Sequence, residues 1–178
     1  MKETILISGG QGKLALEIKK CANNYNVLAP TKEEMDIRNI AKISFYLKKY
    51  KPKYFIHAAA FTKPMKNHEK YPKVSISTNI IGTSNIVLAC LNFPKTKLIY
   101  ISTDYVYPGK KGNYKETDGL YPYSMINDGI SKYGWSKLGG ECSVHFLENS
   151  LIIRACLCDH PFPHLAALND VKKSMIYT

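Results

Sequence analysis

The sequence predicts an α/β fold built on a doubly wound parallel sheet, and three observations predict it. Short β-rich apolar runs alternate with stretches of helical periodicity between residues 4 and 154. A glycine-rich turn separates the first run from the first helical stretch, and a long polar loop follows the fourth run. Strands and helices that alternate in this way form βαβ units with right-handed crossovers, and their ligands bind beyond the carboxyl ends of the strands.

Two periodicities define the expected elements. The run 98–102 is almost continuous in apolar residues, as in a strand that is covered on both faces. Apolar residues that recur on one face predict the helices. The segment from Thr103 to Ser131 is rich in Tyr, Gly and Pro, and we expect it to be the functional loop. We expect strands at 4–8, 27–29, 54–58, 98–102 and 151–154, and helices directly after Gly12 and at 40–50, 75–91 and 132–147.

The composition limits the class of protein. A chain of 178 residues with 45% hydrophobic residues can bury the core of one domain, or of one domain and part of a second. The net charge of +11 comes almost entirely from lysines spread along the chain, because Arg38 and Arg154 are the only arginines. Surfaces that read nucleic acid usually rely on arginine. We therefore expect a solvated lysine surface, and the alternative is an anionic partner, either a phosphorylated small molecule or, less favoured by the lack of arginine, a nucleic acid.

The sequence also predicts where the protein works. No apolar run has the length expected of a membrane-spanning helix, and the apolar part of the N-terminus is too short for a signal peptide. The five cysteines form no secreted-type framework, so we expect a cytoplasmic protein with free thiols and no membrane partner. We also expect no metal site, because Cys156, Cys158, His160 and His164 match no usual zinc spacing.

The turn Gly9-Gly10-Gln11-Gly12 lies between the first strand and the first helix. Residues without side chains let the backbone approach a pyrophosphate, and the helix N-terminus offers free N–H groups and a positive dipole end. The spacing is Gly9-x-x-Gly12-x-x-Ala15, which differs from the GxGxxG fingerprint. Its place between a strand and a helix indicates a Rossmann-type dinucleotide site, and an ordinary βα turn is the alternative.

The end of the second strand bears on the choice of cofactor. A carboxylate there would bind the ribose 2′-hydroxyl of NAD, but this chain has Ala29-Pro30-Thr31-Lys32. A cation and a hydroxyl suit the extra phosphate of NADP, so we expect NADPH at Lys32, with NADH as the alternative. Asp36 and Ile37 begin the next segment and are expected to cap the adenine pocket.

Tyr133 and Lys137 form the predicted catalytic pair. Residues i and i+4 share a helix face, so we expect the Lys137 ammonium to lie near the Tyr133 phenol and to favour its ionised form. Such a tyrosine can donate a proton to a carbonyl oxygen while hydride arrives at the carbon. A hydroxyl at the end of the fourth strand would bind the same oxygen, and Thr103 is the first candidate, followed by Ser102. We expect His57, at another strand end, to be packed or hydrogen-bonded rather than catalytic.

Four stretches of this chain resemble the extended short-chain dehydrogenase/reductase superfamily, and most closely its dTDP-4-dehydrorhamnose reductase branch. They are ILISGGQGKLA at 5–15, HAAAFT at 57–62, YISTDYVYPG at 100–109 and YGWSKLGGE at 133–141. The resemblance implies a catalytic triad of Thr103, Tyr133 and Lys137, in which Lys137 also holds the nicotinamide ribose. The remaining positions that it implies for cofactor binding or support are Gly9, Gln11, Gly12, Lys13, Leu14, Ala58, Ala59, Thr62 and Asn79.

The resemblance also implies a division of the chain and an activity. Residues 1–154 would form the NAD(P)-binding Rossmann domain, and 155–178 would begin a substrate-binding region that is truncated here. The implied activity is NADPH-dependent reduction of a nucleotide-linked 4-keto-6-deoxy sugar in carbohydrate biosynthesis. Tyr105 after Thr-Asp argues against a dehydratase. A nucleotide-sugar epimerase and a non-catalytic subunit similar to the regulatory subunit of methionine adenosyltransferase remain alternatives, and a homodimer is open.

Overall fold

The computed structural model describes residues 2–62, 64, 66–108, 113–120, 123–124 and 129–156. Among these residues, five parallel strands form a sheet in the order β2-β1-β3-β4-β7. Because β2 and β3 lie on opposite sides of β1, the strand order reverses at β1, which is where open α/β sheets bind ligands. The strands are β1 (Thr4–Ser8), β2 (Asn26–Leu28), β3 (Tyr54–His57), β4 (Lys97–Ser102) and β7 (Ser150–Arg154).

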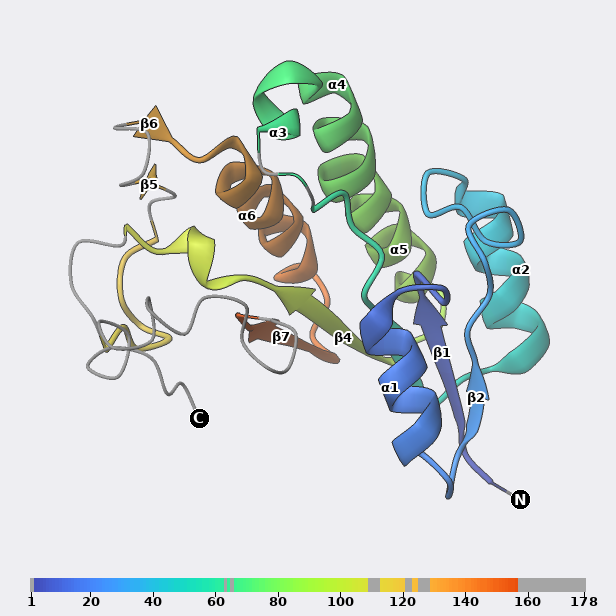
Figure 1. Cartoon of the computed structure of the whole chain (residues 1–178). Coiled ribbons are helices and arrows are strands. Elements are labelled where there is room, and N and C mark those ends of the chain that lie inside the picture. The colour runs from blue at the N-terminus through green and yellow to red at the C-terminus, as the bar shows by residue number, and fades with distance from the viewer. Residues whose placement is uncertain are drawn as a thin grey trace.

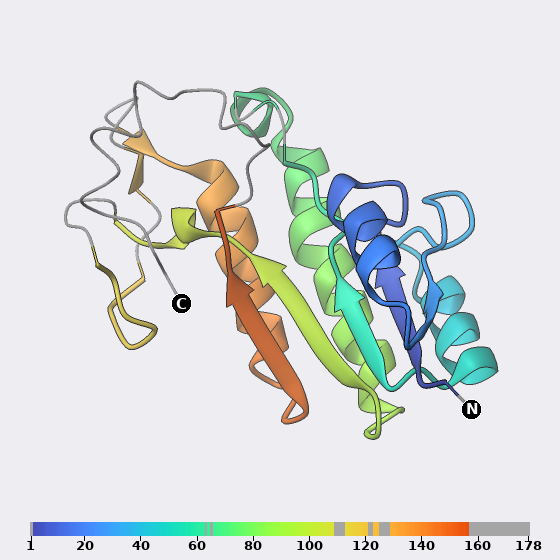
Figure 2. The ribbon, with the colours of Figure 1, turned by 60° about the horizontal axis from the view of Figure 1, so that its bottom comes forward.

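Helices cover both faces of this sheet. Helix α1 packs on one face, while α2, α5 and α6 lie on the opposite face (Figures 1 and 2). A π-helical segment, Ile76–Ile81, joins α4 and α5 into one long helix. The helices are α1 (Lys13–Cys21), α2 (Ile40–Tyr50), α3 (Asn67–Lys70), α4 (Pro72–Ser75), α5 (Gly82–Leu91) and α6 (Lys132–Val144).

The core follows from the alternation of side chains along each strand. Ile5 and Ile7 of β1 point to the α1 face and pack with Ala15, whereas Leu6 packs on the opposite face with the helices there. All three β1 residues are buried. The doubly wound parallel sheet that the sequence predicts is therefore confirmed.

Most predicted elements differ from the structure by a few residues at their ends, and helix α6 ends at Val144 instead of residue 147. The second strand is Asn26–Leu28, one residue earlier than predicted, because Pro30 and the following turn end the run. The long helix begins at Pro72, since proline suits the first turn of a helix. The predicted loop after β4 contains a 3₁₀ turn, Asp104–Val106, and the short antiparallel pair β5 (Tyr123–Ser124) and β6 (Gly129–Ile130).

The expectation that no stretch could span a membrane is wrong by length and composition. The continuous helix Pro72–Leu91 has 20 residues and passes that test. Its polar residues Ser75, Asn79 and Thr83 are buried and make hydrogen bonds inside the protein. A helix that packs on a sheet inside a protein is also apolar on its packed face, so it passes the same length and composition test as a membrane-spanning helix.

Candidate active site

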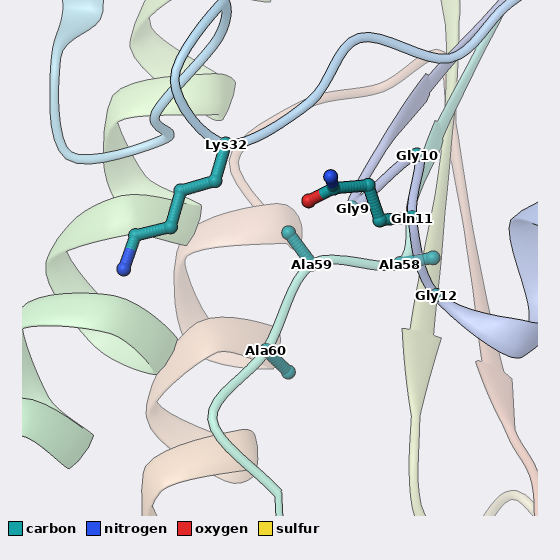
Figure 3. Close-up of a pocket in the computed structure, with 8 residues that line it drawn as sticks. All are labelled: Gly9, Gly10, Gln11, Gly12, Lys32, Ala58, Ala59 and Ala60. Atoms are coloured by element: carbon teal, nitrogen blue, oxygen red, sulfur yellow. The ribbon is translucent and has the colours of Figure 1, made fainter.

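A hollow of about 170 Å³ lies where the sheet order reverses, between the glycine turn and the segment after β3. Figure 3 shows its wall of small residues, with Gln11 and Lys32 as its longer side chains. The lining residues are Gly9, Gly10, Gln11, Gly12, Lys32, Ala58, Ala59 and Ala60. Of the residues predicted to bind the cofactor, Gly9, Gln11, Gly12, Lys32, Ala58 and Ala59 therefore meet at one place.

Only glycine fits the first two positions of the turn. Gly9 has φ +76°, and a Cβ there would lie 3.0 Å from the Ala59 backbone. A Cβ on Gly10 would lie 2.1 Å from the carbonyl oxygen of Ala29, and its own N–H donates to the Pro30 carbonyl at 3.2 Å. The turn is thus pressed against the end of β2 and the segment after β3.

The N-terminus of α1 has the features of an anion-binding site. Gly12 is the N-cap residue, no side chain caps the helix, and its first turn holds no acidic residue. The backbone N–H groups of the first turn and the positive end of the helix dipole therefore lie next to the glycine turn that lines the hollow. A bare turn followed by an uncapped helix of nine residues suits a pyrophosphate group.

The other predicted cofactor residues do not line this hollow. Lys13 and Leu14 open α1, and Thr62 is exposed beyond β3. Asp36 forms an ion pair with Arg38, and the hydrogen bonds from that guanidinium lower the Asp36 pKa to about 2. Ile37 is 4% exposed and packs against Gly82 in the core. The structure thus places Asp36 and Ile37 away from the lining, and their role at an adenine pocket stays a prediction.

Tyr133 lies at the start of α6, beside the end of β4. The Ser131 hydroxyl caps this helix by accepting from the Gly134 N–H at 3.0 Å. Burial raises the pKa of Tyr133 to about 12, and a hydrogen bond with the Thr103 side chain offsets part of that rise. The Thr103 hydroxyl also accepts from the Tyr105 N–H at 3.3 Å. Thr103 and Tyr133, predicted from segments 30 residues apart, are therefore neighbours.

Lys137 is buried and points toward β4. Its Nζ donates to the Ile101 carbonyl at 2.7 Å and lies 4.2 Å from the centroid of the Tyr100 ring. Burial lowers the pKa of Lys137 to about 7. The prediction that this lysine brings the Tyr133 pKa down is wrong for this structure, because burial dominates and raises that pKa. Tyr133 is consequently a protonated phenol at neutral pH.

Asn79 connects the two parts of the site. Its side-chain oxygen accepts from the Phe61 N–H at 2.7 Å, and its Nδ2 donates to the Phe61 carbonyl and to Ser136 Oγ, both at 2.9 Å. It thereby ties the segment after β3 to α6 between Tyr133 and Lys137. This arrangement gives Asn79 a supporting place next to the predicted catalytic helix.

His57 is packed and hydrogen-bonded, as the sequence predicts. Its Nδ1 lies 2.8 Å from Ser8 Oγ, its Nε2 lies 2.9 Å from Thr83 Oγ1, and its ring lies beside Tyr100. Burial lowers the His57 pKa well below its usual value. His57 is therefore a neutral link between β1, α5 and β4.

Sequence reasoning missed His68. Its ring lies 5.0 Å from that of Tyr133 and 4.7 Å from that of Phe61, and its Nδ1 is 2.7 Å from Ser75 Oγ. It is also the buried side chain whose Nε2 lacks a hydrogen-bond partner among the described residues. No local pattern signals this position, since α3 has only four residues and its contact with α6 is tertiary.

The described residues contain no group of three or more His, Cys, Asp or Glu side chains arranged to hold a metal ion. The cysteines at 21, 90, 142 and 156 are free thiols. Cys158, His160 and His164 lie outside the described residues.

Comparison with known proteins identifies relatives of this chain. The profile of the family described as RmlD substrate binding domain matches residues 1–158. A dTDP-4-dehydrorhamnose reductase of Aggregatibacter actinomycetemcomitans is 33% identical over 155 residues, which is 84% of this chain and 50% of that protein. Methionine adenosyltransferase 2 subunit beta of Xenopus tropicalis is 28% identical and covers 84% of this chain and 45% of its own length.

A solved structure agrees with these matches. The crystal structure of a dTDP-4-dehydrorhamnose reductase from Bacillus anthracis in complex with NADP superposes with a TM-score of 0.76 and 31% identity. The match covers 86% of this chain and 53% of that one. The chain thus spans about half the length of the relatives that it matches.

Proposed function

Because the chain belongs to the RmlD substrate binding domain family, we propose that it carries the NADPH-dependent reductase chemistry of a nucleotide-linked 4-keto-6-deoxy sugar. One observation supports this proposal best. The Thr103 side chain is hydrogen-bonded to Tyr133 beyond β4, and Lys137 follows Tyr133 by one turn of α6 and donates to the Ile101 carbonyl of β4. The glycine turn before α1 lies in the same domain. The proposed proton donor and the proposed dinucleotide site therefore both lie at the carboxyl edge of the sheet.

The cofactor would lie along the carboxyl edge of β1 and β3. The turn from Gly9 to Gly12 and the N-terminus of α1 suit its pyrophosphate, and Lys32 suits the 2′-phosphate that distinguishes NADPH. Ala58 and Ala59 leave room beside the turn. When bound, the reduced nicotinamide supplies the hydride. The NADP complex of the Bacillus anthracis relative supports this choice of cofactor.

The chain's own residues supply the proton and the orientation. Tyr133 keeps its proton at neutral pH, because burial raises its pKa to about 12. It would donate that proton to the keto oxygen as the carbon is reduced. Thr103, which is hydrogen-bonded to Tyr133, would hold the same oxygen. Lys137 would bind the nicotinamide ribose and supply positive charge as the phenolate forms.

We further propose that residues 1–154 are the nucleotide-binding domain and that residues from 155 on begin the substrate-binding part. We also propose a homodimer that forms through exposed apolar side chains of the long helix Pro72–Leu91 and of the residues after α6, namely Ile81, Leu88, Leu91 and Phe146. The free thiols of the described cysteines support a reducing cytoplasmic setting. Sedimentation of the purified chain tests the dimer.

Calorimetric titration tests the cofactor site first, with NADPH and NADH added separately. We expect tighter binding of NADPH, followed by turnover of dTDP-4-keto-6-deoxy sugar with oxidation of NADPH. Net oxidation of NADPH separates a reductase from an epimerase, which retains its cofactor. If neither NADPH nor NADH binds to the chain, the proposal is wrong.

A second candidate function rests on the similarity to methionine adenosyltransferase 2 subunit beta. Such a protein would keep the reductase fold and act through a partner chain. Binding of NADPH without turnover of any keto sugar, together with a stable complex with a methionine adenosyltransferase, would favour this function over the first.

A further inference from the structure

Glu141 is a buried carboxylate that the proposed reaction does not use. It is 0% exposed and lies one helical turn after Lys137, which is 3% exposed, and two turns after Tyr133. Residues at i, i+4 and i+8 share one face of a helix. The face of α6 that carries the proton donor and the lysine therefore ends on a buried negative charge.

The Glu141 carboxylate ties three elements together. It accepts a hydrogen bond from the Ser102 hydroxyl at the end of β4. It also accepts from Arg154 at the end of β7, with Nη2 at 2.9 Å and Nε at 3.2 Å from its oxygens. Ser102 directly precedes Thr103. A displacement of Glu141 would thus move both the strand end that carries Thr103 and the helix that carries Tyr133.

Arg154 extends the same network to the loop after β4. Its Nη1 donates to the Tyr107 hydroxyl at 2.8 Å and to the Glu116 carbonyl at 3.4 Å, and its guanidinium lies over the Tyr107 ring. A buried ion pair with such complete hydrogen bonding keeps both charges at low cost, whereas removal of one partner leaves the other uncompensated.

Burial disfavours the charge of Lys137, whereas its contacts with the Tyr100 ring and the Ile101 carbonyl favour it. Tyr100 of β4 lies under its ammonium, His57 of β3 is neutral, and Tyr133 of α6 is a protonated phenol. A Cβ on Gly140 would lie 2.5 Å from the Tyr100 hydroxyl, so this glycine lets α6 approach β4 closely. Burial lowers the Lys137 pKa to about 7, and Glu141 acts in the opposite direction.

Other charged groups are differently placed. Asp104 and His68 act on or contact Tyr133 rather than Lys137. Burial raises the pKa of Asp104, and burial lowers that of His68. Arg154 forms an ion pair with Glu141, with 2.9 Å between Nη2 and Oε2. Among the described residues, Glu141 is the anionic group that favours the charged form of Lys137.

We propose that Glu141 is a positioning residue for Tyr133 and Lys137. It holds α6 against the ends of β4 and β7 through Ser102 and Arg154, and its carboxylate is the buried anionic group one helical turn beyond Lys137. Its consequence for reduction and for NADPH binding rests on the proposed function. Its effect on Lys137 itself does not, and can be measured without substrate or cofactor.

The test follows the ionisation of Lys137 directly. The full 178-residue chain is labelled with ¹³C at the lysine Cε, and its lysine resonances are titrated by NMR; Lys137→Met identifies the resonance of interest. We expect E141Q to lower the pKa of Lys137 by about one pH unit, because the buried negative charge is lost and Arg154 remains unpaired. R154M keeps the carboxylate, so it should leave the pKa unchanged or raise it.

The two substitutions separate charge from structure. A purely structural role would loosen the same ion pair in both variants and would move the Lys137 pKa in the same direction, which would overturn the proposal. If E141Q alone does not fold, the double variant E141Q/R154M removes both buried charges and restores folding. The Lys137 pKa should still fall in that variant, and an unchanged value would also overturn the proposal.

A second readout connects this device to the proposed function. In a chain that binds NADPH, E141Q should weaken binding more at pH 8 than at pH 6, because Lys137 loses its proton earlier. A wild-type chain that binds no NADPH would contradict the proposed function alone. The NMR titration would still decide the role of Glu141.

Discussion

The two halves of the sheet build their sites in different ways. Around β1 and β3, the predicted cofactor site is made of backbone and small residues, and Leu6 and Ile7 are completely buried on opposite faces. Around β4 and β7, the predicted catalytic groups depend on buried polar and charged side chains. One face of β7 is also open in the described part of the chain, with Leu151 45% and Ile153 40% exposed.

This difference teaches what each half tolerates. The glycine turn works through the absence of side chains, so any added atom meets backbone. The half around β4 and β7, which carries the predicted catalytic residues and is called the catalytic half below, depends on paired buried groups. The loss of one partner there leaves the other buried without a hydrogen-bond or charge partner. Substitutions should therefore separate binding of the cofactor from chemistry, and the following experiments order these effects from the largest to the smallest.

Tyr133→Phe should remove the chemistry of the catalytic half and leave the cofactor half intact. Loss of the proposed proton donor should reduce the proposed turnover of the keto sugar by about 10²- to 10⁴-fold. Calorimetry should show nearly unchanged affinity for NADPH, since the turn and α1 are untouched. Tyr25→Phe, at an exposed position just before β2, is the matched control. Near-complete turnover by the Tyr133 variant would rule out this residue as the donor.

Gly10→Ala should damage the cofactor half. Its Cβ would lie 2.1 Å from the Ala29 carbonyl oxygen and 2.6 Å from that of Pro30, and backbone cannot move aside cheaply. We expect the free energy of unfolding to fall by about 3 kcal/mol, with loss of NADPH binding. Gly119→Ala is the control, because a Cβ there meets nothing within 4 Å. Equal denaturation midpoints for the two variants would contradict the tight turn.

The cofactor half was largely predictable from sequence. Strand β1, the glycine turn and α1 are contiguous in the chain, so local periodicity and the small residues at 9, 10 and 12 suffice. Local periodicity also predicted whether each long element is a helix or a strand. The residues at which the elements begin and end were harder to predict, because Pro72 and the π-helical segment Ile76–Ile81 extend the long helix beyond its apolar pattern.

The catalytic half was only partly predictable. Spacing on one helix identifies Tyr133 and Lys137, but their ionisation depends on burial by distant segments. Burial raises the Tyr133 pKa where helix spacing alone had predicted a lower one. The contacts of His68 and the ion pair of Glu141 with Arg154 are tertiary, and no pattern along the chain contains them.

The pH dependence of the free energy of unfolding tests the role of His57, whose ring lies beside Tyr100 of β4. His57 connects Ser8 of β1 with Thr83 of α5 and stays neutral when folded, because burial lowers its pKa. The unfolded chain takes up a proton near pH 6.5 while the folded chain does not. The free energy of unfolding should therefore fall below about pH 6.5, by up to about 1.4 kcal/mol per pH unit for this histidine.

His57→Asn should flatten that dependence, and denaturant titrations between pH 7.5 and pH 5 provide the measurement. Burial also lowers the pKa of His68, so part of the slope should persist in the variant. His145→Asn is the control on the far end of α6. An equal slope in wild-type and His57→Asn would mean that His57 is protonated in the folded chain.

Lys32→Ala should give the smallest change in NADPH affinity. It tests whether a single side-chain charge contributes to binding at a site that is otherwise made of backbone and small residues. Lys32 is exposed at the rim of the hollow, so solvent screens its attraction for a phosphate. Calorimetry should show roughly fivefold weaker binding of NADPH and unchanged binding of NADH. Lys19→Ala, exposed on α1, removes the same charge away from the hollow. If both variants weaken NADPH equally, the +11 charge of the whole chain attracts the dinucleotide and Lys32 does not select it.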